Sequence, residues 1–453
     1  MSRLNNKILL LIVILSISFI PLSAFNAYEV QGSIFVDDDA DPSWYDATHV
    51  HNISEAIDNA TAGDTVIIYN GNYTESPFTI NKNLTFIGEN EWQVRVFFNV
   101  VPSSPQIGAA MYITSDDVII YNMTVYSAFL GRIIWATESH VSLQRMYIHD
   151  LRSMSSEQMV SFNPSGGIPY EDRIRVKNCT FYGKGVGPCI HLQRVDDYTI
   201  RDNTFYNNSG SYAETLSLIR TSNGTIYNNY FEEEGILISD ADYLNISSNI
   251  IDYSSGYGIE CDGHIHYLDI FNNRIYNCNY GIYSDWGEDT GITHGTVSHN
   301  VVRNCTNTGI ELAQNPFPLN ISHNYVYNST EGIVVIPLYY YTTGTCNISF
   351  NNIFDIEDEA IDFQADNGTI YNNTIWNTED GIYVNANNLT ISKNYFYNLT
   401  DVALNVNNID NCSIFKNTIV ECRVGIDYVA TNMICYNNTF RNNTIAIEGA
   451  SVH

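Results

Sequence analysis

The sequence predicts an all-β chain folded as a parallel β-helix, a solenoid in which each coil stacks on the coil before it. An asparagine returns every 20 to 27 residues inside the template I-x-x-N-x-[hydrophobic]. Nine or ten residues after most of these asparagines, a small residue precedes an aliphatic one, as in Gly258-Ile259. A fixed period with two short β patterns and no helical stretch is typical of a β-solenoid. The repeated asparagines are Asn203, Asn229, Asn249, Asn273, Asn300, Asn324, Asn351, Asn373, Asn394, Asn417 and Asn438.

Residues 1–24 are typical of a secretion signal, because Arg3 and Lys7 precede the apolar run from Ile8 to Ile20. The following Pro21-Leu22-Ser23-Ala24 offers a cleavage region, and an uncleaved anchor is the alternative. We therefore expect a secreted or cell-surface protein, which is not an integral membrane protein if the signal is cleaved. The remaining residues, 28–453, are expected to form one β-helix domain.

A short helix is predicted near the start of this domain. After a strand at residues 33–36, Ile53, Ala56, Ile57 and Ala60 recur at helical spacing, and Asn52 precedes them as a candidate N-cap. We expect this helix to cap the N-terminal end of the solenoid. The intervening Asp37 to Asp41 run is interpreted as a turn rather than a calcium loop.

The coils are expected to begin at residues 66–69 and 84–88 and to number about fifteen, each stacked ~4.8 Å above the last. Stacked asparagines can bond amide to amide along such a solenoid, and asparagine also suits left-handed turns. The sequence stops directly after the small-aliphatic step of its last coil, Ala446-Ile447. Two explanations stay open: a partner copy covers this end through end-to-end self-association, or the sequence is part of a longer protein.

The charge balance limits the partners. The formal net charge is −30, from 20 basic and 50 acidic residues. Nucleic acid is therefore excluded as an expected partner, because phosphate binding requires clustered cations. An acidic surface instead fits Ca²⁺ or another divalent cation, a salty exterior or solubility. Twenty Asn-x-Ser/Thr sequons are potential glycosylation sites of an exported protein, although the repeat itself also generates them.

Nine cysteines are an odd number, so at least one is unpaired. Cys278 and Cys305 each follow a repeated asparagine by five residues in adjacent coils. We therefore predict a disulfide between them, and expect Cys179 and Cys261 to fill the core.

The start of the domain carries a family resemblance. Residues 34–42, IFVDDDADP, are followed by ISEAI at residues 53–57 and AGDTVIIYNGNY at residues 62–73. These segments and the later repeats resemble archaeal surface proteins with NosD-like, pectin-lyase-type right-handed β-helix repeats. The resemblance implies a right-handed solenoid and carbohydrate binding or cleavage, with copper delivery implied only for the NosD branch. This chain departs from a copper role, since it has seven methionines and no Met- or His-rich cluster.

The strand after each small-aliphatic step is expected to alternate between core and solvent. Acidic residues recur at its solvent-facing positions in three successive coils, and two long insertions flank them. Close carboxylates raise one another's pKa, as a general acid requires, and aromatic side chains over an acidic floor are typical of a sugar groove. The predicted catalytic residues are Asp262, Asp285 and Glu311, and the predicted substrate-binding residues are Glu260, His264, Trp286, Tyr339, Tyr340 and Tyr341.

Three functions follow from this pattern. The first is binding of an extracellular polysaccharide or surface glycan, or a part in an envelope or adhesive structure. The alternative is a hydrolase or lyase acting on such a glycan through the acidic groove. The same acids could instead hold Ca²⁺, or form an ordinary solvated surface.

Overall fold

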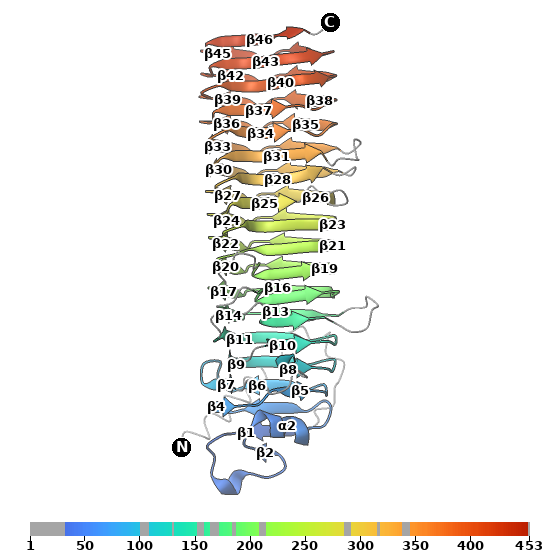
Figure 1. Ribbon diagram of the computed structural model, residues 1–453, viewed down its shortest axis with the longest axis vertical. Coiled ribbons are helices and arrows are strands. Elements are labelled where there is room, and N and C mark those ends of the chain that lie inside the picture. Colours follow the sequence, from blue (N-terminus) through green and yellow to red (C-terminus); the bar gives the residue numbers. More distant parts are fainter. Residues whose placement is uncertain are drawn as a thin grey trace.

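The computed structural model describes residues 32–99, 108–128, 131–151, 158–163, 172–183, 187–207, 214–284, 291–314, 318–337 and 345–451. They form a parallel β-solenoid of about 15 turns. Figure 1 shows it as a straight rod with the chain climbing from one end to the other. The predicted fold class is confirmed.

Each coil contributes strands to three parallel stacks, which we call A, B and C in the order that the chain visits them. Strands of one stack pair in register with those of the next coil, and four long strands bend from one stack into the next. Stack A contains β1 (Ser33–Val36), β2 (His49–Val50), β3 (Thr65–Ile68), β6 (Thr85–Gly88), β13 (Ile174–Lys177), β16 (Asp196–Arg201), β19 (Ser222–Tyr227), β26 (Gly291–Ser298), β29 (Leu319–Ser322), β32 (Cys346–Ser349), β35 (Gly368–Tyr371), β38 (Leu389–Ser392), β41 (Cys412–Phe415) and β44 (Ile434–Tyr436). Stack B contains β4 (Gly71–Thr74), β7 (Val94–Phe98), β14 (Thr180–Tyr182), β17 (Thr204–Tyr206), β20 (Tyr230–Glu232), β22 (Ile250–Asp252), β24 (Arg274–Tyr276), β27 (Val301–Arg303), β30 (Tyr325–Ser329), β33 (Asn352–Ile356), β36 (Thr374–Trp376), β39 (Tyr395–Tyr397), β42 (Thr418–Val420) and β45 (Thr439–Arg441). Stack C contains β5 (Phe78–Ile80), β8 (Ala109–Ile113), β10 (Arg132–Ala136), β12 (Val160–Phe162), β15 (Ile190–Gln193), β18 (Leu216–Ile219), β25 (Tyr280–Ser284), β28 (Thr308–Gln314), β31 (Glu331–Pro337), β34 (Glu359–Phe363), β37 (Asp380–Val384), β40 (Val402–Asp410), β43 (Val424–Thr431) and β46 (Ile445–Ser451). The long strands are β9 (Ile119–Ser127) and β11 (Ser142–Asp150), from A into B, and β21 (Ile236–Ser247) and β23 (Tyr257–Phe271), from C into A.

The predicted capping helix is confirmed as α2 (Ile53–Asn59), which lies beside β1 at the N-terminal end of the rod (Figure 1). The Asn52 side chain accepts a hydrogen bond from the Glu55 N–H, as an N-cap does. Ile53, Ala56 and Ile57 are buried against the first coil. A single turn of 3₁₀ helix, η2 (Pro42–Trp44), precedes it.

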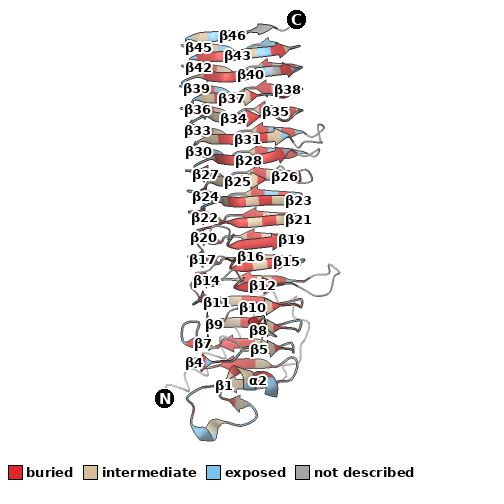
Figure 2. Ribbon diagram, viewed as in Figure 1, coloured by how far each residue is buried: buried red, intermediate tan, exposed pale blue. Residues whose placement is uncertain are grey.

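The core is a continuous column of apolar side chains inside the three stacks. Figure 2 shows buried residues on strands along the rod. Inward positions of stack C predicted from the alternation, such as Leu192, Cys261, Leu312 and Phe363, are all at most 1% exposed. Apolar burial of this kind stabilises each coil only against its neighbours, because a solenoid has no long-range core contacts.

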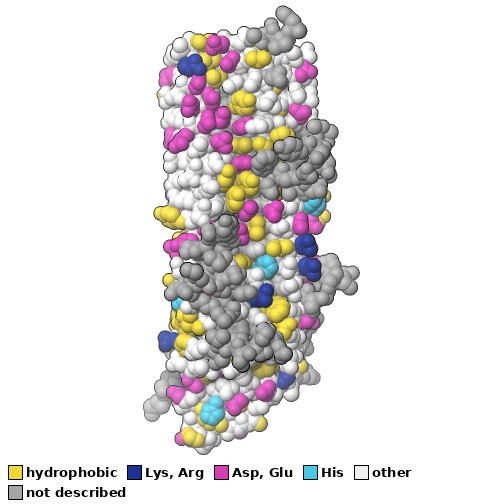
Figure 3. Space-filling view, in the orientation of Figure 1, with side chains coloured by type: hydrophobic (Ala, Val, Ile, Leu, Met, Phe, Trp, Pro, Cys, Tyr) yellow, Lys and Arg dark blue, Asp and Glu magenta, His cyan; other side chains and the backbone are white. Residues whose placement is uncertain are grey.

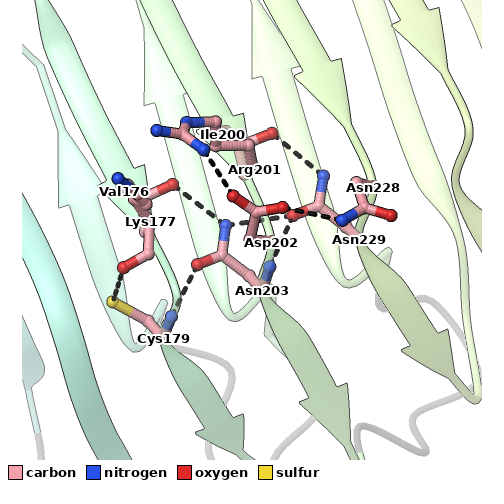
Figure 4. Close-up of polar contacts among 9 residues, drawn as sticks. All are labelled: Val176, Lys177, Cys179, Ile200, Arg201, Asp202, Asn203, Asn228 and Asn229. Atoms are coloured by element: carbon pink, nitrogen blue, oxygen red, sulfur yellow. Dashed lines mark hydrogen bonds and ion pairs between the residues drawn. The ribbon is translucent and has the colours of Figure 1, made fainter.

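The repeated asparagines form the predicted ladder between stacks A and B. The Nδ2 group of Asn203 donates to Oδ1 of Asn229, 3.0 Å away, and the same bond repeats coil by coil to Asn438. Each Oδ1 also accepts from the backbone N–H of the previous asparagine, and each Nδ2 donates to a backbone carbonyl such as that of Val176 (Figure 4). Every side-chain polar atom of the ladder is therefore satisfied inside the protein.

The residue before each ladder asparagine adopts a positive φ, for example 57° at Asp202 and 56° at Asn272. The left-handed turn thus precedes the ladder asparagine, while the asparagine itself supplies the hydrogen bonds. Non-glycine residues enter this region at a cost, and Asn and Asp tolerate it best.

Cys278 and Cys305 are free thiols, so the predicted disulfide between them is wrong. The Sγ of Cys278 donates to the carbonyl of Tyr276 at 3.2 Å. In-register coils hold stacked Cβ atoms roughly 4.8 Å apart, whereas a disulfide spans about 3.8 Å between them. The thiols instead pack beside the small residues at the start of the stack C strands. A Cβ added to Gly281, for example, would lie 3.3 Å from the Cys305 Sγ.

The inward side chains of the last described coil are open to solvent. Ile447 is 48% exposed, whereas Ile426, its register partner one coil earlier, is 0% exposed. Figure 2 shows the same change from buried to exposed colours at β45 and β46. No helix in the described ranges is both long and apolar enough to cross a membrane.

Candidate functional site

Two of the predicted site residues, Glu260 and Glu311, lie on the outer surface of stack C. The register there aligns one outward residue per coil into a single line, which we call the C column. From N- to C-terminal coils it consists of Leu237, Glu260, Tyr283, Glu311, Val334, Asp362, Tyr383, Asn405 and Asp427.

Glu260 and Glu311 therefore share the C column, two coils apart, with Tyr283 between them. Asp262 lies in a neighbouring column, paired with Ser239, and His264 is exposed with its N–H donating to Asp240. The structure does not bring Asp262 next to Glu311. The other predicted residues, Asp285, Trp286, Tyr339, Tyr340 and Tyr341, lie outside the described residues, and their roles stay predictions.

The acids that do surround Glu311 come from the following coils. The Thr308 hydroxyl lies 2.7 Å from Oε2 of Glu331 and 3.3 Å from Oε2 of Glu311, so one hydroxyl joins two carboxylates. Burial raises the pKa of Glu311, opposed by the Thr308 hydrogen bond and assisted by the charges of Glu331 and Asp362. Burial and the neighbouring carboxylates thus both favour the protonated form of Glu311.

Asp362 is the acid of the C column with a strongly raised pKa. It is 8% exposed, its Oδ2 accepts from the Gln364 side chain at 2.7 Å, and its Oδ1 is buried without a hydrogen-bond partner in the described structure. Burial raises its pKa to about 6, with the charges of Glu331 and Asp358 acting in the same direction against the Gln364 hydrogen bond. A buried carboxyl that is protonated near pH 6 can donate a proton to a substrate.

Two further acids extend the group. Burial raises the pKa of Glu359 to about 7, and the charge of Asp358 and a hydrogen bond with it add to the effect. Burial also raises the pKa of Asp380, whose Oδ1 accepts from the Val402 N–H at 2.7 Å. We use the name acid groove for the two neighbouring lines of acids on the outer surface of stack C, without implying a hollow; its members are Glu311, Glu331, Glu359, Asp362 and Asp380.

Tyrosines border the acid groove at both ends. Tyr257, Tyr280 and Tyr283 pack together on the N-terminal side, with ring centroids 4.6 to 5.3 Å apart. On the C-terminal side Tyr383 follows Asp362 directly in the C column, and its hydroxyl accepts from Asn407 at 3.4 Å. Carboxyl groups can form hydrogen bonds with the hydroxyl groups of a sugar, and tyrosine rings can pack against the faces of its ring.

Sequence reasoning selected Glu311 but not the neighbouring acids Glu331, Glu359 and Asp380. The signal was present: each of these three acids stands directly before the small residue of its coil. In-register stacking makes three such positions one line on the surface, Glu331 beside Glu359 beside Asp380. An acid that recurs directly before the small residue in successive coils therefore identifies this line of acids.

Two family descriptions match the chain. Residues 109–294 match the family described as periplasmic copper-binding protein (NosD), and residues 336–452 match the right-handed β-helix region. No curated protein sequence matches this chain.

Solved structures with the same fold are distant in sequence. A mannuronic acid specific polysaccharide family 6 lyase from human gut microbiota is 13% identical, with a TM-score of 0.51 over 81% of this chain and 86% of its own. A family 6 polysaccharide lyase from Pseudopedobacter saltans is 15% identical, with a TM-score of 0.46 over 72% and 84%. A periplasmic alginate epimerase is 13% identical, with a TM-score of 0.41 over 83% and 85%. At these identities the likeness concerns the fold alone.

The donor groups on the described part of the chain do not fit copper. There, the one group of three or more His, Cys, Asp or Glu side chains within ligand distance is Asp37, Asp38 and Asp39. Copper favours imidazole, thiolate and thioether ligands, whereas these are hard oxygen atoms. They also serve the turn that the sequence predicted, since Asp38 accepts from the Asn72 N–H and Asp37 from the Asp39 N–H.

The repeat, the three parallel stacks and the matched segments at 109–294 and 336–452 agree with one another. They also agree with the resemblance of the segments within residues 34–73 to NosD-like β-helix proteins. Two segments of the chain are therefore similar to known families, residues 109–294 to NosD and residues 336–452 to right-handed β-helix regions.

Proposed function

We propose that the protein is exported and binds an extracellular polysaccharide along the acid groove. The observation that carries this proposal is a set of half-buried and buried acids on two neighbouring lines of stack C, bordered by tyrosines. From Tyr283 to Tyr383 the C column spans four coil steps, about 19 Å, which suits a short stretch of a sugar chain lying along the rod axis. Carboxyl groups there accept hydrogen bonds from sugar hydroxyls, so we expect a neutral glycan.

Replacing Tyr383 with alanine is expected to weaken glycan binding about tenfold, because a sugar ring loses an aromatic face at the groove. The matched control is Tyr325→Ala, since Tyr325 is 49% exposed on stack B, away from the groove. Titration calorimetry with a bound oligosaccharide measures both variants. Equal affinity of Tyr383→Ala and the wild type would argue against the groove as the binding site.

A second candidate function is hydrolysis of the bound glycan, favoured by the raised pKa of Asp362. Asp362 would protonate the leaving oxygen, and Glu311 would activate water. Two coil steps separate their Cα atoms by about 9.6 Å. The carboxyl groups of inverting glycosidases are ~6.5–9.5 Å apart, so this mechanism needs the two side chains to incline slightly toward each other. A lyase is less suited to these acids, because it needs a nearby cation to neutralise a uronate and Arg274 and Arg303 lie on stack B.

Export rests on residues 1–24, and N-terminal sequencing of the protein secreted by its host tests cleavage after Ala24. Assays in Ca²⁺ and in EDTA test whether the acids also serve as calcium ligands, since oxygen-rich clusters suit that ion.

A further inference from the structure

The positive charges of this acidic protein are gathered in one part of the chain. Ten of its twenty Lys and Arg residues lie between positions 132 and 220, together with nine Asp and Glu residues. That segment is close to neutral, while the whole chain carries −30. On the face seen in Figure 3, Lys and Arg lie mainly in the N-terminal half of the rod and acids crowd its C-terminal coils.

Within this segment a cleft of about 150 Å³ opens on the outer surface of stack A. Its lining consists of Gln144, Arg175, Lys177, Thr199 and Arg201, which come from β11, β13 and β16 in three consecutive coils. No acid lines it. The cleft is on a different stack from the acid groove and several coils away.

The register places the cations against one another. Lys177 and Arg201 are direct partners in adjacent strands, and Gln144 is the partner of Lys177 on the other side. Figure 4 shows Lys177 and Arg201 on neighbouring coils. Two like charges one coil step apart, about 4.8 Å between Cα atoms, repel each other unless a counter-charge intervenes.

Internal acids neutralise only part of this cluster. Asp197 holds the Arg175 guanidinium through two bonds of 2.9 and 3.1 Å, and Asp202 takes one Nη1 bond of Arg201 at 2.5 Å. The Lys177 ammonium has no hydrogen-bond partner among the described residues. Burial and the nearby Arg201 lower the pKa of Lys177, which Asp202 opposes only in part.

Tyrosines continue the same line of side chains at both ends. Tyr121 precedes Gln144 and Tyr227 follows Arg201 in the register, so the line runs Tyr, Gln, Lys, Arg, Tyr over five coils. The Arg201 guanidinium lies 5.7 Å from the Tyr227 ring centroid, and Arg145 donates to the Tyr121 hydroxyl at 2.9 Å. Ring faces at both ends of a cationic cleft suit a chain of rings that carries negative charge.

We propose that this stack A cleft is a second glycan site that binds an acidic polysaccharide, with a carboxylate or sulfate group of one sugar held between Lys177 and Arg201. Gln144 and Thr199 donate to or accept from the hydroxyl groups of the same sugar. The site is independent of the acid groove, whose charge would repel such a chain. It gives the protein a means of holding a charged matrix polymer while the acid groove faces a neutral one.

The test measures binding of a hexameric galacturonate and of a sulfated dextran oligomer to the whole protein by titration calorimetry. Lys177→Gln is expected to weaken binding about tenfold, since a charge-assisted hydrogen bond is lost. The control Arg220→Gln removes the same charge outside the cleft, from a side chain that is 59% exposed, and should change affinity less than twofold. Removing a repelling charge should leave the thermal midpoint of Lys177→Gln unchanged or raised, which separates lost binding from lost folding.

Binding of either acidic oligomer with this dependence on Lys177 supports the site, and the tighter ligand identifies the anionic group. Failure of both to bind, or equal losses in Lys177→Gln and Arg220→Gln, would overturn it. Equally tight binding of a DNA oligomer would also overturn it, because the cleft would then select charge rather than sugar. Uncharged oligosaccharides test the acid groove separately, so failure of one site leaves the other measurable.

Discussion

Replacing Asn300 with alanine is expected to lower the free energy of unfolding by about 4 kcal/mol, the sum of two buried groups left without partners at ~1–3 kcal/mol each. Asn300 is 0% exposed, its Oδ1 accepts from the Asn273 N–H, and its Nδ2 donates to the Ile270 carbonyl. Alanine leaves that N–H and that carbonyl unpaired in the core. Denaturation in guanidinium, followed by circular dichroism, measures the loss.

The control is Asn320→Ala in unglycosylated protein, because Asn320 is an exposed strand residue on the outside of stack A. Its replacement should change stability by no more than about 0.5 kcal/mol. Since coils are stabilised by their neighbours, the Asn300 variant should also unfold in two steps where the ladder is interrupted. Equal stabilities of the two variants would mean that the ladder contributes little.

Replacing Asp362 with asparagine is expected to reduce glycan hydrolysis by about 100-fold or more, the usual contribution of a general acid. Glycan affinity should persist, since the groove keeps its shape and its tyrosines. Because the pKa of Asp362 is about 6, wild-type turnover should fall as the pH rises above 6 and the acid loses its proton. Reducing-end assays from pH 4 to pH 8 measure this. Asp427→Asn, one outward acid farther along the C column, is the matched control.

The raised pKa of Asp362 also predicts how the stability of the folded protein changes with pH. The folded-state pKa of Asp362 lies above its ordinary value of 3.8, so the folded protein binds this proton more tightly than the unfolded chain. The contribution to stability is therefore full below pH 4 and is lost as the pH rises through 6. At pH 8 the Asp362→Asn variant should have a higher thermal midpoint than the wild type, and this advantage should vanish at pH 4. A midpoint difference independent of pH would contradict the buried carboxyl.

The sequence predicts much of this architecture because every coil repeats the same physical problem. A ladder residue must bond to the coils on both sides with one side chain. Asn203 does so by donating to the Val176 carbonyl and to Asn229 Oδ1 and by accepting from the Cys179 N–H. Alternation likewise predicts inward residues such as Leu312 and Phe363. The capping helix is predictable for a local reason, since Asn52 and the apolar spacing after it need only one turn of context.

The site is less predictable because its neighbours depend on register across coils. Asp262 and Glu311 look alike in their coils, yet only Glu311 shares a hydroxyl with another acid, Glu331. The burial of the Asp362 carboxyl group depends on how neighbouring coils pack, and residue spacing within the sequence does not reveal that packing. The predicted Cys278–Cys305 disulfide is absent for a related reason, because in-register stacking holds Cβ atoms about 4.8 Å apart and a disulfide needs about 3.8 Å.

The central claim is that the acid groove of stack C binds a neutral polysaccharide, and a glycan panel applied to the wild-type protein tests it most directly. Retention of each glycan and release of new reducing ends would be followed at pH 5.5, in Ca²⁺ and in EDTA. We predict retention of at least one uncharged polysaccharide, lost in competition with its own oligosaccharides and weakened by Tyr383→Ala. Retention of no neutral glycan across a broad panel would contradict the claim.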